Sequence, residues 1–145
     1  MKSLVVVLLG VVWSAGMLWA LPPVSGECVA GNCKSGKGTL HYADGGVYEG
    51  SFKGGVRSGQ GLYTHPSGIR YEGSFEGGYF HGEGTLTSED GRAYRGAFVE
   101  GAFHGFGRYS WPDGAVYEGE FDEGHFHRGV LRYPDGTERV FEPEE

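Results

Sequence analysis

Residues 71–84 read Tyr-Glu-Gly-Ser-Phe-Glu-Gly-Gly-Tyr-Phe-His-Gly-Glu-Gly, and this stretch decides the fold. Its opening, Tyr-x-Gly-x-Phe, recurs every 23 residues, and its closing Gly-x-Gly keeps the same period. A fixed period of this length is typical of repeat architectures, so the sequence predicts an array of small units. The openings begin at Tyr48, Tyr71, Tyr94 and Tyr117, the Gly-x-Gly elements at Gly36, Gly59, Gly82 and Gly105, and the unit-closing glycines are Gly45, Gly68, Gly91 and Gly114.

Each unit is predicted to be a β-hairpin. In a strand, successive side chains alternate between two faces, so Tyr48, Gly50 and Phe52 should share one face. A glycine-rich turn follows at residues 53–56, and a second strand runs through residues 61–63. No segment has a helical period. We therefore predict an all-β fold, an elongated single-layer antiparallel meander of 23-residue hairpin repeats.

The glycine content supports the same fold. Glycine makes up 29 of the 145 residues, but there is no collagen triplet and only 6 prolines. The chain also has 9 Tyr, 9 Phe and 3 Trp residues, which excludes disorder. A glycine in mid-strand costs roughly 0.5 to 1 kcal/mol. We expect an aromatic ring of one strand to lie over the bare backbone of the next strand and to offset that cost.

The repeat pattern predicts how the chain after residue 26 is divided into units. The last unit is irregular, because Arg128 stands where the other units have a glycine and Gly136 arrives one residue early. Atypical end units are expected in a repeat array. The predicted parts are a divergent capping repeat (27–47), four repeats (48–70, 71–93, 94–116 and 117–139) and an acidic tail (140–145).

Residues 1–26 have the character of a secretory signal peptide. Lys2 is followed by an apolar stretch at residues 4–21, two prolines and small residues ending at Gly26. Cleavage is expected after Gly26 or, as the alternative, after Ala20. An uncleaved membrane anchor formed by residues 4–21 is the other interpretation. In either case the rest of the chain is predicted to be exported, to a periplasmic or extracellular location.

Two cysteines follow directly, at Cys28 and Cys33. An even pair in an exported chain predicts a disulfide. Closing so short a loop should contribute about 2 kcal/mol in the chain-entropy model. Zinc is the rival interpretation, but two thiols with no nearby histidines make a poor zinc site.

The charge balance is acidic. The chain has 12 Lys and Arg residues against 19 Asp and Glu, for a net charge of -7. Lys2 is the one charged residue among residues 1–26, so an exported domain without them would carry -8. This balance argues against nucleic acid as a partner, because phosphates are bound by Lys and Arg. It also argues against electrostatic adhesion to anionic lipid.

The repeat unit resembles the MORN family (membrane occupation and recognition nexus), whose 23-residue hairpin reads YEGxFxxGxxHGxGxYxxxxG. Residues 71–84 and 94–107 follow that pattern closely, and the resemblance covers about residues 31–136. The departures are Arg57-Ser58, where a histidine is usual, and the shortened last unit. The resemblance implies a binding and scaffolding module, and association with membranes has been suggested for such repeats.

We predict no catalytic, cofactor or metal site. His81, His104 and His127 recur with the repeat, but neighbouring copies should lie two strands apart, roughly 9 to 10 Å. That separation is too large for a shared metal ion. The repeated carboxylates form an outward column that Arg95 interrupts, and we interpret this column as a solvated face. Its members are Glu49, Glu72 and Glu118.

The aromatic stripes are the predicted interaction surface. A single-layer sheet cannot cover both sides of every ring, so we expect some apolar surface to stay exposed and to mark a contact surface. The predicted function is a non-enzymatic, exported scaffold that binds a protein partner, as a monomer or an edge-to-edge dimer. The alternative is association with membrane lipid or a cell-envelope polymer through the same face. The surface comprises Tyr48, Phe52, Tyr71, Phe75, Phe80, Tyr94, Phe98, Phe103, Trp111, Tyr117, Phe121 and Phe126.

Overall fold

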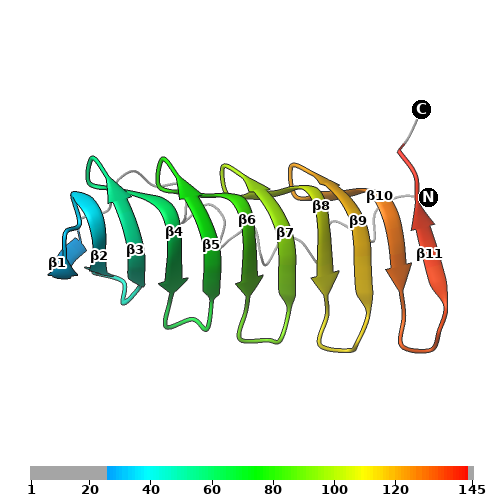
Figure 1. The fold of residues 1–145 in the computed structure, drawn as a ribbon. Coiled ribbons are helices and arrows are strands. Elements are labelled where there is room, and N and C mark those ends of the chain that lie inside the picture. Colours follow the sequence, from blue (N-terminus) through cyan, green and yellow to red (C-terminus); the bar gives the residue numbers. More distant parts are fainter. Residues whose placement is uncertain (1–25, 144–145) are drawn as a thin grey trace.

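The computed structural model describes residues 26–143, which form one antiparallel sheet (Figure 1). Its eleven strands lie side by side in the order in which they occur in the chain, so each strand pairs only with its sequence neighbours. Within this range the chain forms no helix. The predicted all-β single-layer meander is thus confirmed. The predicted signal peptide or anchor lies outside the described residues, apart from Gly26.

Figure 1 shows the strands as a long row of hairpins that runs from β1 to β11. The strands are β1 (Gly26–Gly31), β2 (Ser35–Tyr42), β3 (Val47–Lys53), β4 (Val56–Thr64), β5 (Arg70–Glu76), β6 (Tyr79–Thr87), β7 (Ala93–Val99), β8 (Ala102–Ser110), β9 (Val116–Asp122), β10 (His125–Arg132) and β11 (Glu138–Phe141).

Two kinds of turn alternate along the array. The turns at the upper edge in Figure 1 have two central residues with positive φ, as in Gly54 (60°) and Gly55 (78°) between β3 and β4. Positive φ at both positions defines the tight type I′ hairpin turn. The turns at the lower edge end on a glycine, as in Gly68 (φ 81°), whose N–H donates to the carbonyl of His65. The predicted turn glycines therefore lie where the sequence placed them.

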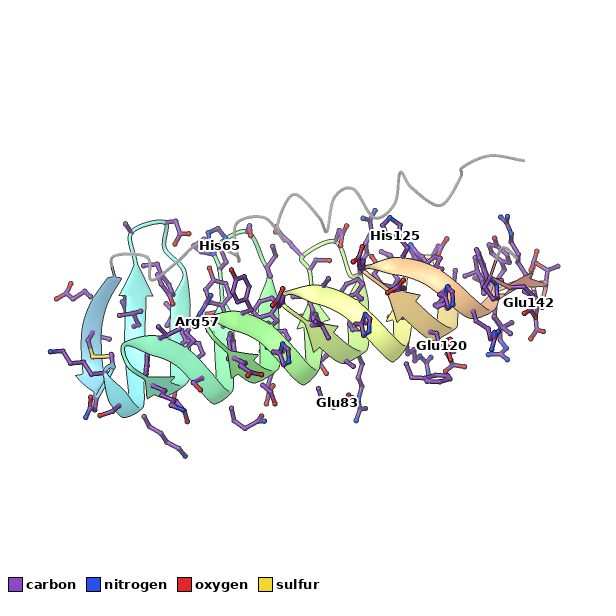
Figure 2. The ribbon with its side chains drawn as sticks, turned by 90° about the horizontal axis from the view of Figure 1, so that it is seen from above. Arg57, His65, Glu83, Glu120, His125 and Glu142 are labelled. Atoms are coloured by element: carbon purple, nitrogen blue, oxygen red, sulfur yellow. A yellow bond between two sulfur atoms is a disulfide. The ribbon has the colours of Figure 1, made fainter. Side chains whose placement is uncertain are left out.

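The sheet is bent along a line near its upper edge. In the pairing of β5 with β6, Gly73 faces Gly84 and Phe75 faces Phe80, so Ser74 alone faces three residues of β6. Gly82, in this extra stretch, has a φ of 73°. The same register shift recurs between β3 and β4 and between β7 and β8. The upper ends of the strands therefore fold over the lower parts (Figures 1 and 2).

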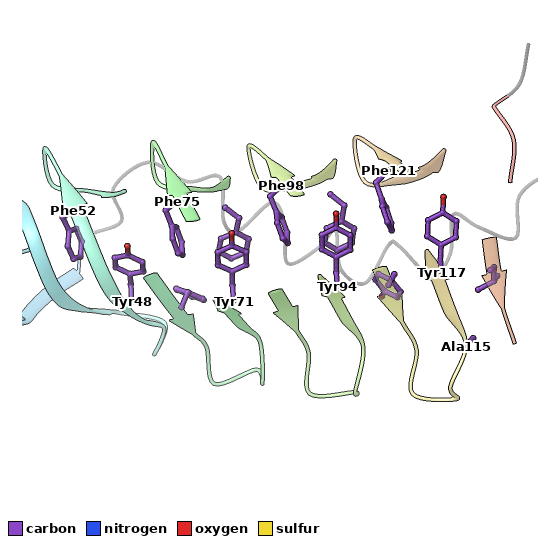
Figure 3. Close-up of a cluster of buried hydrophobic side chains, with 14 residues drawn as sticks. Tyr48, Phe52, Tyr71, Phe75, Tyr94, Phe98, Ala115, Tyr117 and Phe121 are labelled. Carbon is purple, nitrogen blue, oxygen red and sulfur yellow. The ribbon is translucent and has the colours of Figure 1, made fainter. Parts of the chain in front are cut away.

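The aromatic rings fill the inside of this bend. In Figure 3, the Phe rings point down from the folded upper ends and the Tyr rings point up from the lower strands. Tyr71 stacks on Phe80, with ring centroids 3.7 Å apart, and meets Phe75 edge-on at 5.1 Å. Tyr71 also covers Gly84 of the next strand. The expected packing of rings over mid-strand glycines is thus confirmed. We call this side of the sheet the inner face and the opposite side the outer face.

The two ends of the array differ from the middle. At the first strands, Cys28 and Cys33 form the predicted disulfide between β1 and the β1–β2 turn. At the other end, Phe141 of β11 packs against Tyr117 with ring centroids 5.6 Å apart. β11 (Glu138–Phe141) spans the predicted boundary at residue 139, so its last two residues lie in the stretch predicted as the acidic tail.

Candidate functional site

The predicted aromatic surface is almost entirely core. We expected some apolar surface of these rings to stay exposed, but ten of the twelve side chains are buried. The folded upper ends of the strands cover the side of these rings that a flat sheet would leave open (Figure 3). Trp111 and Phe126 alone among the twelve are half-buried. The ten buried side chains are Tyr48, Phe52, Tyr71, Phe75, Phe80, Tyr94, Phe98, Phe103, Tyr117 and Phe121.

The buried tyrosines have structural roles. The Oη of Tyr48, Tyr71, Tyr94 and Tyr117 each donates a hydrogen bond to the carbonyl oxygen three residues ahead, at 2.8 to 2.9 Å. Burial raises the pKa of Tyr48 and Tyr117 to about 12 and that of Tyr71 higher still. These phenols are thus neutral donors that fix the backbone, since loss of their protons would leave a buried charge.

Arg57 places a positive charge in the aromatic core, at a position where the following repeats have an apolar ring. Arg57 takes the place that phenylalanine has in the next three repeats, and its guanidinium lies 5.4 Å from the ring centre of Phe75 and 5.9 Å from that of Tyr48. It also donates a hydrogen bond to the carbonyl of Gly78. The cation is held between rings by cation–π attraction, and Figure 2 shows it inside the curled sheet.

Two of the repeated histidines, His81 and His104, pair with carboxylates. His81 Nε2 lies 3.2 Å from Glu76 Oε2, and His104 Nδ1 lies 3.6 Å from Asp122 Oδ1. Between residues 26 and 143, no three His, Cys, Asp or Glu side chains gather where they could hold a metal ion. Over the same residues, no helix has the length and apolar character needed to cross a membrane.

The outer face carries a network of ion pairs. Arg108 Nη1 lies 3.4 Å from Glu118 Oε1, and Arg132 Nη1 lies 2.8 Å from Glu118 Oε2. Arg70 pairs with Glu72 at 2.6 Å on a more distant strand. The predicted outward carboxylate column is present, because Glu49, Glu72 and Glu118 are all exposed. Exposed pairs of this kind add little stability, typically less than about 1 kcal/mol each.

One large apolar side chain stands on this charged face. Phe106 of β8 is 73% exposed, more than any other large apolar side chain that the structure describes. Its direct partner on the neighbouring strand β9 is the charged residue Glu120. Arg95 of β7 faces Arg108 of β8 directly in the register. We define the Phe106 patch as the outer-face side chains Arg95, Ala97, Phe106 and Arg108.

Sequence reasoning did not select this patch, although a signal for it was available. Tyr109 points to the inner face, so alternation places Arg108 outward and Gly107 inward, and Phe106 outward again. The signal is the residue type at position 106, where the chain has Phe in place of Glu83 and Gln60 of the preceding repeats. Figure 2 shows Glu83, the equivalent of Phe106 in the preceding repeat, on the outer side of the sheet.

Comparison with known proteins identifies the repeat. The model of the MORN repeat matches five consecutive segments, which together make up more than half of the chain. The segments are residues 34–47, 48–70, 71–91, 94–116 and 117–138. No curated protein is similar enough in sequence to count as a relative.

Among solved structures, one similar chain is the TCP domain of SAS-4 (dCPAP) in complex with a proline-rich motif of Ana2 (dSTIL) from Drosophila melanogaster. It is 12% identical, and the match covers 83% of this chain and 97% of that one with a TM-score of 0.23.

Proposed function

The chain belongs to the MORN repeat family, and from this membership we propose that it is an exported, non-enzymatic scaffold that binds a protein partner through the Phe106 patch. Repeats of this family mediate association with proteins or membranes. The proposal names the surface that this chain would use, and the observation that carries it is the 73% exposure of Phe106 on an otherwise charged face.

The inner face offers less for recognition. Its rings are buried against one another and against the glycine backbone, so a partner would find little aromatic surface there. On the outer face, Phe106 lies two residues before Arg108, which faces Arg95 directly across β7 and β8. Aromatic residues and arginine are the types most enriched in protein interfaces. An exposed phenylalanine ring is unfavourable in water and would be covered in a complex.

A binding role without catalysis fits the titratable groups. Catalytic acids and bases are usually distinguished by strong pKa shifts within a shared site. Here the largest shifts belong to the tyrosines, which donate to backbone carbonyls inside the core. The carboxylates on the outer face pair with arginines in open solvent.

Association with lipid or an envelope polymer through the aromatic face was the alternative. Burial of Tyr71, Phe75 and their repeat equivalents removes the exposed apolar face on which that alternative depended. The net charge of the chain, -7, gives no attraction to an anionic surface either. Protein binding at the Phe106 patch is therefore the better supported reading of the family's general role.

The test is photocrosslinking at equivalent positions of three repeats. A benzoylphenylalanine is placed at position 60, 83 or 106 of the full chain, in the cells that make it. We expect a protein adduct at position 106 that is at least tenfold more abundant than at positions 60 and 83. Equal adducts at all three positions, or none at position 106, would refute binding at this surface. Adducts with lipid or glycan alone would support the alternative.

Export has a separate test. Intact-mass measurement of the native product, with cell fractionation, is expected to give a chain that begins at Glu27, outside the cytoplasm. A full-length cytoplasmic product with free thiols at Cys28 and Cys33 would contradict export and the disulfide together.

A further inference from the structure

We propose that the partner segment bound by the Phe106 patch is acidic and carries an apolar side chain, with its carboxylates over Arg95 and Arg108 and its apolar group on Phe106. This inference rests on the proposed function and adds the chemistry of the partner. Three observations carry it: a comparison of this repeat with its neighbours, a pair of like charges, and the charges around Phe106.

The first observation is that one repeat reverses the chemistry of the outer face. Three positions of the patch, those of Arg95, Phe106 and Arg108, differ in kind from their equivalents, which are Glu72, Glu83 and Thr85 in the preceding repeat. In the repeat before that one the equivalents are Glu49, Gln60 and Leu62.

Arg95 and Phe106 thus stand where the preceding repeat has the carboxylates Glu72 and Glu83. The hairpin fold does not require this change, because the other repeats form the same hairpin without it. The replacements also adjoin one another across β7 and β8, so they form one surface.

The second observation is the pairing of like charges. Arg95 and Arg108 are direct cross-strand partners, which places their Cβ atoms about 4.5 to 5.5 Å apart and is unfavourable for two cations. Arg108 has an ion pair with Glu118 at 3.4 Å, whereas Arg95 makes no ion pair with any residue in the described part of the chain. A carboxylate from a partner would neutralise Arg95 and relieve the repulsion, and two-pronged guanidinium–carboxylate contacts are strong.

The third observation is the arrangement of charge around the ring. Phe106 faces Glu120 of β9 in the register. Glu83 of β6 faces Ala97, and Ala97 lies opposite the bulge of β8 that contains Phe106. Carboxylates of a partner are therefore repelled from the line of facing residues that contains Phe106. They are attracted to the line that contains Arg95 and Arg108. The apolar group of the partner segment should thus lie on the Phe106 side and its carboxylates on the arginine side.

The same arrangement disfavours other occupants. A second copy that placed its own patch on this one would bring four arginines together. An anionic bilayer is a broad surface, so it would meet Glu83 and Glu120 as well as the arginines. A basic segment would add to the repulsion at Arg95. An acidic and partly apolar protein segment matches both the two arginines and the exposed ring of Phe106.

The experiment identifies the captured segment and then changes charges, first in the Phe106 patch and then in the captured segment. The adduct formed at position 106 is digested, and the attached segment is sequenced by mass spectrometry. We expect at least two Asp or Glu residues within about five residues of an apolar one. The variants Arg95→Glu and Arg108→Thr, made with the photoreactive group in place, should lower the adduct yield at least tenfold. Arg70→Glu, which makes the same charge change outside the patch, should leave the yield within twofold of the parent.

Rescue and specificity complete the test. Replacing the acidic residues of the captured segment with lysine should restore the yield with Arg95→Glu. Thermal unfolding of every variant checks that the fold persists. A neutral or basic segment, a second copy of this chain, or a yield that Arg95→Glu does not change would overturn the inference while leaving the protein-binding proposal intact. Absence of any adduct at position 106 would overturn both.

Discussion

The ring of Tyr71 fills the space above Gly84 on the neighbouring strand, so that a Cβ atom at position 84 would collide with the phenol. The same relationship links Tyr48 with Gly61, and it recurs in the following repeats. The tyrosine is held from the other side by Phe80, which stacks on it at 3.7 Å. The glycine and the ring are therefore one unit of packing, repeated along the sheet.

Replacement of Gly84 by alanine should be strongly destabilising. The added methyl group has no room unless Tyr71 leaves its stack on Phe80, and forced overpacking of this kind costs about 3 kcal/mol. The control is Gly136→Ala, which has open space but a φ of 84° and should cost roughly 1 kcal/mol. Urea unfolding measures both, and equal losses would contradict the packing argument.

Replacement of Tyr71 by phenylalanine should lower stability by about 1 kcal/mol. The change keeps the ring but removes the hydrogen bond, 2.8 Å long, to the carbonyl of Ser74. Tyr133→Phe, at a side chain that is 39% exposed, serves as the control and should change stability by less than about 0.5 kcal/mol. If both variants melt at the parent temperature, the hydroxyl does not stabilise the bend.

The turn between β7 and β8 can be improved. Glu100 has a φ of 49°, in a region that side chains other than Asn and Gly avoid, whereas Gly54 and Gly77 occupy the equivalent position in earlier repeats. Glu100→Asn creates the Asn-Gly pair that type I′ turns prefer and should stabilise by roughly 0.5 to 1 kcal/mol. Glu89→Asn, at a turn residue without positive φ, is the comparison. A lower melting temperature for Glu100→Asn would show that the turn is not strained.

Stability should fall as the pH rises above 10. Burial raises the pKa of Tyr48, Tyr63 and Tyr117 from 10.0 to about 12. Between these two values the unfolded chain has released phenol protons that the native chain still holds, so stability is full below pH 10 and declines through the window up to about pH 12. The free energy of unfolding at pH 8, 10 and 11 measures this loss. Tyr48→Phe should make the decline shallower, and a stability that stays constant to pH 11 would contradict the prediction.

The sequence was sufficient for the fold because its signals are local. The 23-residue period, the turn glycines and the alternation around Tyr71 and Phe75 each concern residues close in the chain, and all three are confirmed in the structure. The prediction of rings over glycines is confirmed for the same reason, since the ring and the glycine belong to adjacent strands.

The burial of the rings could not be predicted from local sequence signals. Alternation assumes a flat strand, whereas the positive φ at Gly82 and the three residues of β6 opposite Ser74 fold the upper part of the sheet back over the rings. A glycine in the sequence does not reveal whether it serves a turn, a close approach or a bend. The Phe106 patch was overlooked because a surface aromatic is obscured in a chain with so many core aromatics.

The strand order has a consequence for how the chain acquires its structure. Because each strand pairs only with the one before and the one after it, no strand must wait for a partner that is distant in sequence. Contacts of low sequence separation close with little loss of loop entropy and favour fast folding. Once one hairpin with its Tyr and Phe rings has formed, the next can add to its open edge as soon as its 23 residues are free. Structure can thus grow in step with the emergence of the polypeptide, in the direction from β1 to β11.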